Sequence, residues 1–99
     1  MITELKDTCA LMDSDDYRER FMAEYFQLKI RLEKLKAFLE KWDRNELEFI
    51  PNCPRETYNF QIKAMQEYHD ILVIRAEIEN IEIRKPSVVE GVELKGGEK

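Results

Sequence analysis

The stretch YRERFMAEYFQLKIRLEKLKAFLEKW, residues 17–42, decides the fold of this chain. Its apolar side chains recur at alternating steps of four and three residues over three heptads, which predicts one long amphipathic helix. At about 1.5 Å per residue this helix is roughly 40 Å long, too long for the rest of the chain to wrap. Its apolar seam must therefore meet another long helix. The seam consists of Phe21, Tyr25, Leu28, Leu32, Leu35, Leu39 and Trp42.

A second long helix is predicted from Pro54 to Ile81 or Arg84. Before it, Pro51 and Pro54 prevent the first helix from continuing, so residues 46–54 form a connector. The second helix carries an apolar seam of its own, with the spacing that mates antiparallel with the first. This seam consists of Tyr58, Ile62, Met65, His69, Leu72 and Ala76.

The two ends of the chain have different characters. A short amphipathic N-terminal helix is predicted from apolar residues at steps of three and four, namely Ile2, Leu5, Cys9 and Met12. Asp16 and Glu19 then form a capping-box-like start for the long helix. The sequence thus predicts an all-α fold, an antiparallel two-helix hairpin with a short N-terminal helix, as one domain over residues 1–85. Residues 86–99 are predicted to form a tail, either a flexible end or a short strand at Val92 and Leu94.

Both long helices carry apolar side chains beyond the two seams, and these predict assembly into an oligomeric helical bundle. The first helix has a small second patch, and the second helix has an adjacent stripe that also includes Phe60, Ala64 and Tyr68. Surplus apolar surface of this kind usually marks an interface. The predicted interface between copies consists of Met22, Phe26, Ile30, Ile71, Ile74, Ile78 and Ile81.

Composition limits the classes of protein to consider. Charged residues make up 37% of the chain, and the uncharged apolar runs are only a few residues long, so no membrane span of roughly 18 residues is expected. The start has no secretory pattern, and Cys9 and Cys53 lack paired spacing, so we expect a soluble protein with free thiols in the cytoplasm. A net charge of −5 argues against general nucleic-acid binding.

The sequence offers little for catalysis. His69 is the single histidine and lies on the seam of the second helix, where a packed imidazole is the simpler interpretation. All three glycines, Gly91, Gly96 and Gly97, lie in the tail, so no phosphate-cradling loop is possible. We therefore predict a protein that is not an enzyme, with no cofactor and no metal.

A nucleotide site remains possible, because it needs cations for phosphate and flat rings for bases. The residues 29–36, KIRLEKLK, hold four cations against one glutamate. The simpler interpretation of this run is a solvated helix face with Lys29–Glu33 and Lys36–Glu40 pairs. The predicted ligand-binding residues are Lys29, Arg31, Lys36, Arg55, Tyr25 and Tyr58.

Two segments, DYRERFMAEYFQLKIRLEKLKAFLEKW and FQIKAMQEYHDILVIRAEIENI, resemble a group of very small bacteriophage proteins related to crAss-like phages. In that group an ERLxxEYxQLKxRxxKLxxFL-type helix precedes an LxxQxxAMxxYxxILxxRxxxL-type helix. The resemblance spans residues 16–81. The matching residues are Tyr25, Gln27, Leu28, Lys29, Arg31, Leu32, Lys34, Leu35, Phe38 and Leu39 in the first segment, and Gln61, Ala64, Met65, Tyr68, Ile71, Leu72 and Arg75 in the second.

The resemblance implies a viral accessory protein in the cytoplasm of a bacterial host, with no catalytic motif to transfer. Small oligomeric helical phage proteins are often counter-defence factors, including sponges for cyclic nucleotide or ADP-ribose-type immune signals. One hypothesis is therefore a homo-oligomer that sequesters such a signal without cleaving it. The alternative is a helical module that inhibits or scaffolds a host defence protein or a phage protein through the isoleucine face of the second helix.

Overall fold

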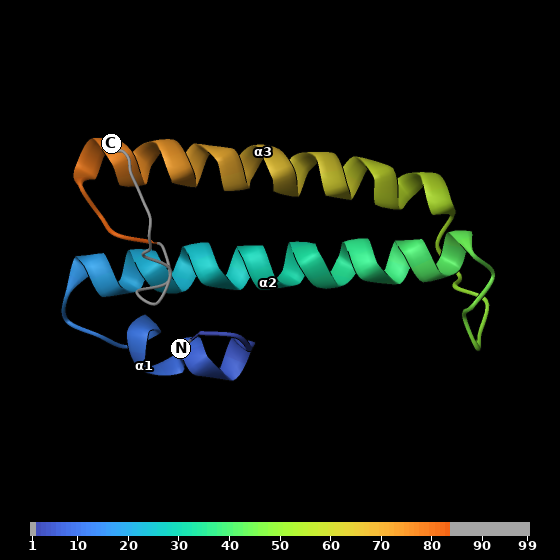
Figure 1. The fold of residues 1–99 in the computed structure, drawn as a ribbon, viewed down its shortest axis with the longest axis horizontal. Coiled ribbons are helices and arrows are strands. Elements are labelled where there is room, and N and C mark those ends of the chain that lie inside the picture. The colour runs from blue at the N-terminus through green and yellow to red at the C-terminus, as the bar shows by residue number, and fades with distance from the viewer. Residues whose placement is uncertain (1, 84–99) are drawn as a thin grey trace, which may run out of the picture.

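The computed structural model describes residues 2–83, and this part of the chain is helical without any strand (Figure 1). The predicted all-α class is confirmed. The predictions for the tail, including a strand at Val92 and Leu94, fall outside the described residues. The elements are a 3-10 turn η1 (Leu5–Thr8), a single helical turn α1 (Cys9–Met12), and the two long helices α2 (Tyr17–Asp43) and α3 (Arg55–Glu79).

The two long helices run antiparallel, and α2 lies between α3 on one side and the N-terminal segment on the other (Figure 1). The predicted seam is confirmed: Phe21, Tyr25, Leu28, Leu32 and Leu39 of α2 are buried, as are Leu72 and Ala76 of α3. The remaining seam residues are half-buried. The hydrophobic effect on these two stripes therefore holds the hairpin closed.

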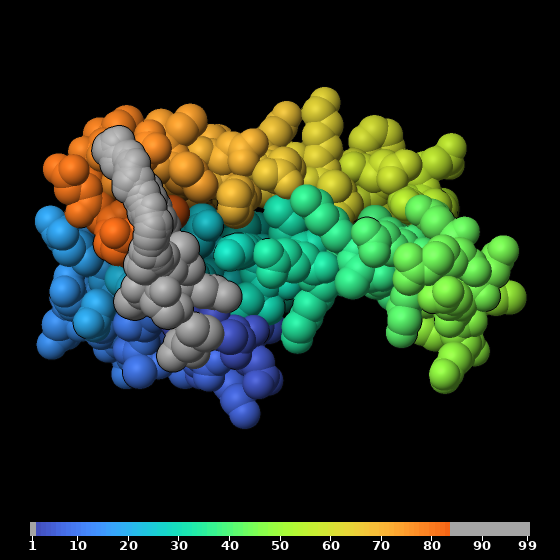
Figure 2. All heavy atoms as spheres, viewed as in Figure 1, coloured from blue at the N-terminus to red at the C-terminus, as the bar shows by residue number. Residues whose placement is uncertain are grey.

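The core is concentrated at one end of the hairpin, where all three layers meet. The N-terminal segment lies against the first half of α2 and does not reach the connector (Figure 2). Ile2 and Ile83, from near the two ends of the described chain, both pack against this cluster. Its buried members are Phe21, Tyr25, Phe26, Leu28, Leu72, Ala76 and Ile81.

The N-terminal segment covers a second face of α2, and this corrects part of the predicted interface. Phe26 and Ile30 are buried within the chain itself, and Met22 packs against the core. Thr8, completely buried, fixes the segment: its hydroxyl donates to the Leu5 carbonyl at 2.7 Å and accepts from Gln27 Nε2 at 2.9 Å. Met22, Phe26 and Ile30 of α2 are therefore covered by other parts of the same chain.

The predicted stripe of the N-terminal helix is wrong in its second half, because Cys9 and Met12 are exposed. The segment starts as a 3-10 turn, which has about three residues per turn rather than 3.6. This tighter winding turns Thr8, rather than Cys9, toward α2.

The start of α2 agrees with the sequence, since Asp16 is the N-cap and its Oδ1 accepts from the Arg18 N–H at 2.9 Å. The end of α3 does not. Asn80 adopts a left-handed conformation with φ 58°, which ends the helix at Glu79 rather than at Ile81 or Arg84. The Ile81 N–H donates to the Ala76 carbonyl at 2.9 Å, the bond of a Schellman motif.

This cap corrects the prediction for Ile81, which was placed in the interface between copies as a continuation of the helical stripe. The turn at Asn80 instead folds Ile81 back onto Ala76, and both residues belong to the core. Asn45, with φ 59°, ends α2 in the same way: its N–H donates to Trp42, and the Glu46 N–H donates to Lys41.

One apolar face remains uncovered within residues 2–83. Phe60, Ile71, Ile74 and Ile78 of α3 are exposed, by 75% at Phe60 and 74% at Ile78. At about 100° per residue these four positions lie opposite the seam that faces α2. We call them the outer face of α3. No helix in this part of the chain is long and apolar enough to cross a membrane.

Candidate functional site

The six predicted ligand-binding residues do not gather at one place. Lys29 and Lys36 lie about two helical turns apart on one flank of α2, whereas Arg31, two residues after Lys29, points about 200° away. Arg55 and Tyr58 belong to the first turns of α3, at the other end of the hairpin from the core. Helix geometry therefore divides the predicted set into separate groups.

Tyr25 is not available as an open stacking surface. Its side chain is buried in the core cluster, and its ring lies 5.1 Å from that of Phe26 and 5.4 Å from that of His69. Burial raises the pKa of the Tyr25 hydroxyl, and the nearby Glu33 charge raises it further. Tyr25 is thus a neutral core residue in this structure.

Lys36 belongs to a chain of polar contacts between the long helices. Its Nζ donates to Gln66 Oε1 at 3.1 Å, and Gln66 Nε2 donates to Asp70 Oδ1 at 3.0 Å. The same Asp70 oxygen lies 3.2 Å from His69 Nδ1. The hydrogen bonds from His69 and Gln66 hold the pKa of Asp70 below its usual value. Lys36 therefore has a structural partner and an exposed ammonium that can also meet an anion.

An aromatic cluster occupies the hairpin end, where α2 stops and α3 begins. Phe38 lies 5.9 Å from Trp42, 6.2 Å from Phe49 and 6.0 Å from Tyr58, measured between ring centroids. Trp42 and Tyr58 meet edge to face at 5.6 Å. Aromatic pairs of this kind are worth about 0.5–1.5 kcal/mol each beyond area burial. The cluster thus holds the two-layer end of the hairpin together.

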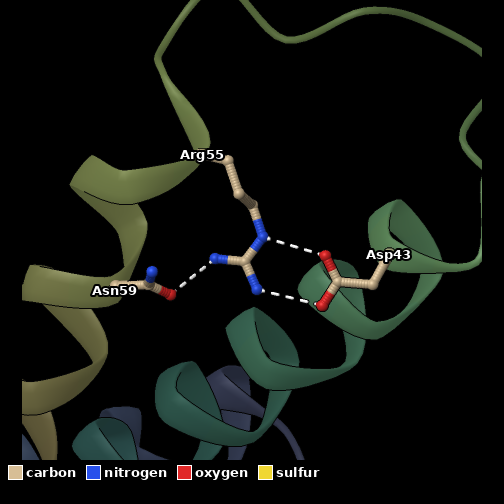
Figure 3. A network of polar contacts seen from close by, with 3 residues as sticks. All are labelled: Asp43, Arg55 and Asn59. Atoms are coloured by element: carbon tan, nitrogen blue, oxygen red, sulfur yellow. Dashed lines mark hydrogen bonds and ion pairs between the residues drawn. The ribbon is translucent and has the colours of Figure 1, made fainter.

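Arg55 connects this cluster to the end of α2 (Figure 3). Its guanidinium donates to both carboxylate oxygens of Asp43 at 3.1 Å and to Asn59 Oδ1 at 2.7 Å. The same group lies over the Trp42 ring, with Cζ 5.9 Å from the ring centroid. The hydrogen bonds from Arg55 lower the pKa of Asp43. Because three of its N–H donors already have partners in the chain, Arg55 positions Trp42 rather than offering an unpaired cation.

A pocket of about 180 Å³ opens beside Trp42, between the end of α2 and the connector. Phe49 and Ile50 form an exposed part of its wall, and Ile50 is 91% exposed. Asn45, held left-handed by the helix cap, contributes an amide. The lining residues are Trp42, Asn45, Leu47, Phe49, Ile50 and Pro51.

Sequence reasoning missed this pocket, although Trp42 was a predicted seam residue and residues 46–54 were a predicted connector. The available signal was the pair Phe49-Ile50, two large apolar residues in a proline-bounded loop. Arg44, next to Asn45, was also missed. Its Nε lies 3.2 Å from Glu46 Oε2, and the two side chains are 58% and 50% exposed.

The pocket is lined by aromatic, aliphatic and amide side chains. None of the residues that line the pocket carries a titratable side chain. Over residues 2–83 no three histidine, cysteine, aspartate or glutamate side chains gather as metal ligands. Flat rings, one amide and neighbouring arginines are groups that recognise a planar ligand with a negative charge.

Comparison with known proteins gives one family. No curated protein and no solved structure matches the chain. The family model called Sequestin matches residues 15–78, from just before α2 almost to the end of α3. This match covers both long helices, the connector and every residue that lines the pocket. The chain therefore belongs to the Sequestin family.

Proposed function

We propose that this protein is a phage counter-defence factor that binds and sequesters a small nucleotide immune signal without cleaving it. The family name denotes sequestration. The phage setting, in the cytoplasm of a bacterial host, rests on the resemblance of both long helices to small phage proteins. A cyclic nucleotide or an ADP-ribose-type molecule is the expected class of signal.

The observation that carries the proposal is the arrangement at the hairpin end. Trp42 and Phe49 line a pocket there. Arg55 of α3 lies over the Trp42 ring, and Arg44, the residue that follows α2, precedes the lining residue Asn45. Base stacking on aromatic rings is worth about 1–3 kcal/mol per base, and guanidinium groups suit phosphate. The lining holds no general acid or base, which favours binding over cleavage.

Self-association belongs to the same proposal. The outer face of α3 exposes Phe60, Ile71, Ile74 and Ile78 on the side away from α2. Large apolar patches on small proteins are usually covered by a partner, and a second copy offers the identical face for a two-fold contact. Phe26, Ile30 and Ile81 of the predicted interface are buried within the chain. The proposed interface is therefore limited to the outer face of α3.

A thermal-shift assay tests sequestration. The purified protein is melted with cyclic di- and trinucleotides and with cyclic ADP-ribose isomers, and inorganic phosphate serves as the ionic control. A ligand at 100 times its dissociation constant adds about 2.7 kcal/mol, which raises Tm by about 10 °C or more in a domain of this size. No shift with any nucleotide contradicts the proposal.

The exposed isoleucines also favour a second candidate function, a helical module that binds a host or phage protein. Light scattering separates the two uses of this face. A mass of two or more chains, reduced to one chain by Ile74→Glu and unchanged by Ile50→Glu, supports self-association. The protein-binding module is supported if the unaltered protein has the mass of one chain and captures one abundant partner from infected cells. Charge reversal at Lys29 and Arg31 should leave that capture unchanged.

A further inference from the structure

We propose that the pocket at the hairpin end is the base-binding subsite of the sequestered nucleotide, with Arg44 beside it for the phosphate. This inference rests on the proposed function and assigns its ligand to a particular surface. The assignment departs from the residues that the sequence favoured, because four of those six lie in the core or on the flanks of α2.

The size of the pocket limits what enters it. Its volume of about 180 Å³ is below the 300–1,000 Å³ or so that is typical of sites enclosing a whole drug-sized ligand. A single flat heterocycle is the part of a nucleotide that fits, so the sugar and phosphates remain at the rim. Among the parts of a small nucleotide, only the base matches both the size and the aromatic walls.

The walls supply what a base requires. Trp42 is held in place by its edge-to-face contact with Tyr58 and by the Arg55 guanidinium. Phe49 is 60% exposed and Ile50 is almost fully exposed, so both have apolar area left for a ligand to cover. Asn45 adds an amide, which can both donate to and accept from the edge of a base.

Two arginines lie near the pocket, and their contacts distinguish them. Arg55 forms a two-bond pair with Asp43 and a third bond to Asn59, which makes it a positioning residue for Trp42. Arg44 forms a surface ion pair with Glu46 at 3.2 Å, and the two side chains are 58% and 50% exposed. Exposed ion pairs of this kind add little to the stability of a protein. A phosphate can therefore replace Glu46 as the partner of Arg44.

The position of Trp42 gives a direct test, because it is the only tryptophan in the chain. Its fluorescence therefore reports on this one ring and its surroundings at the hairpin end. Titration with cyclic di-AMP and with cyclic ADP-ribose is expected to change Trp42 emission over the same concentration range that raises Tm. Ribose 5-phosphate, which has the sugar and phosphate without the base, is expected to leave the emission unchanged.

Three variants separate the roles of the site. Asn45→Gly removes the amide and keeps the left-handed cap, so it is expected to weaken binding about tenfold with little change in Tm of the free protein. Phe49→Ala removes an exposed ring and is expected to weaken binding by tenfold or more. Arg44→Gln is expected to weaken binding and to reduce its dependence on salt.

Two matched controls lie in the N-terminal segment, away from the connector (Figure 1). Met12→Ser changes an exposed apolar residue, and Lys6→Gln removes one exposed positive charge. Both are expected to bind as the unaltered protein does. The pocket assignment would be overturned if a nucleotide raised Tm but left the Trp42 emission unchanged, and if Asn45→Gly and Phe49→Ala bound it as well as the unaltered protein. That result would leave the proposal of sequestration intact. Absence of any nucleotide binding by the unaltered protein would overturn both.

Discussion

Arg55 donates two parallel hydrogen bonds to the carboxylate of Asp43, both at 3.1 Å, and so joins the first turn of α3 to the last turn of α2 (Figure 3). The pair spans the connector and holds the Arg55 guanidinium over Trp42. Charge-assisted bonds in this forked geometry fix orientation as well as distance. The hairpin end is therefore closed by a polar clamp in addition to its aromatic rings.

This clamp predicts a dependence of stability on acid pH. The pKa of Asp43 is lowered in the folded protein, chiefly by the hydrogen bonds from Arg55. Because the pKa of Asp43 is lower in the folded protein, the ionised carboxylate stabilises the fold fully above the ordinary pKa of 3.8. This stabilisation is lost as the pH falls through the pKa of Asp43 in the folded protein. We expect Tm to decrease below about pH 4. Asp43→Asn should show a smaller decrease over that range, measured by circular dichroism from pH 7 to pH 2.

Asp7 and Asp70 also have lowered pKa values, so part of the acid loss remains in Asp43→Asn. Their positions provide the control. Asp70→Asn should also reduce the loss of Tm in acid, but it should leave the Trp42 emission unaltered. Asp43→Asn should change that emission. Identical pH profiles for the unaltered protein and Asp43→Asn would contradict the clamp.

The fold-back of Ile81 predicts a large difference between two isoleucines. Ile81 is 6% exposed and packs in the core cluster, so Ile81→Ala is expected to lower the free energy of unfolding by about 2–4 kcal/mol. Ile50, 91% exposed in the connector, should change it by no more than about 0.5 kcal/mol when altered to alanine. Urea denaturation followed by circular dichroism measures both. Equal effects would mean that Ile81 is not a core residue.

Docking of the N-terminal segment depends on Thr8, whose buried hydroxyl bonds to Leu5 and Gln27. Thr8→Val keeps the shape and leaves the Gln27 amide without its partner, which is expected to cost about 1–3 kcal/mol. The double variant Thr8→Val with Gln27→Leu should recover much of that loss, because neither polar group is then left unpaired. Urea denaturation tests both variants, and a double variant no more stable than Thr8→Val would refute this role.

The left-handed cap at Asn80 predicts opposite outcomes for two small residues. Asn80→Gly should leave stability unchanged or slightly raised, since glycine has no penalty at φ 58°. Asn80→Ala should lower it by about 1 kcal/mol. Asn52→Ala, an exposed connector asparagine outside the positive-φ positions, is the control and should have little effect. Thermal melts of the three variants check the ranking, and equal Tm values for the glycine and alanine variants at Asn80 would contradict it.

Sequence periodicity was enough to predict the hairpin, because burial of a heptad stripe is a local property of each helix. Phe21 and Leu39 face the partner helix as their spacing requires. Residues whose environment depends on chain reversal were less predictable. The burial of Phe26 depends on a 3-10 turn that docks Thr8, and the burial of Ile81 depends on one asparagine adopting φ above zero.

The candidate site was harder to predict than the fold. The cations Lys29 and Arg31 are separated by one residue in the sequence, yet side chains two residues apart on a helix point to different sides. The pocket, in contrast, combines Trp42 from the helix with Phe49 and Ile50 from the connector. No periodicity links these positions, so only the tertiary arrangement brings them together.

The most direct measurement of the central claim is capture and release of the nucleotide. The protein is incubated with cyclic di-AMP or cyclic ADP-ribose and passed through a filter that retains protein. The filtrate is analysed by liquid chromatography and mass spectrometry, and the retained fraction is analysed after heat denaturation. Sequestration predicts that one of these ligands disappears from the filtrate in proportion to protein and returns intact on heating. Full recovery of every ligand in the filtrate, or release of a cleaved product, would contradict it.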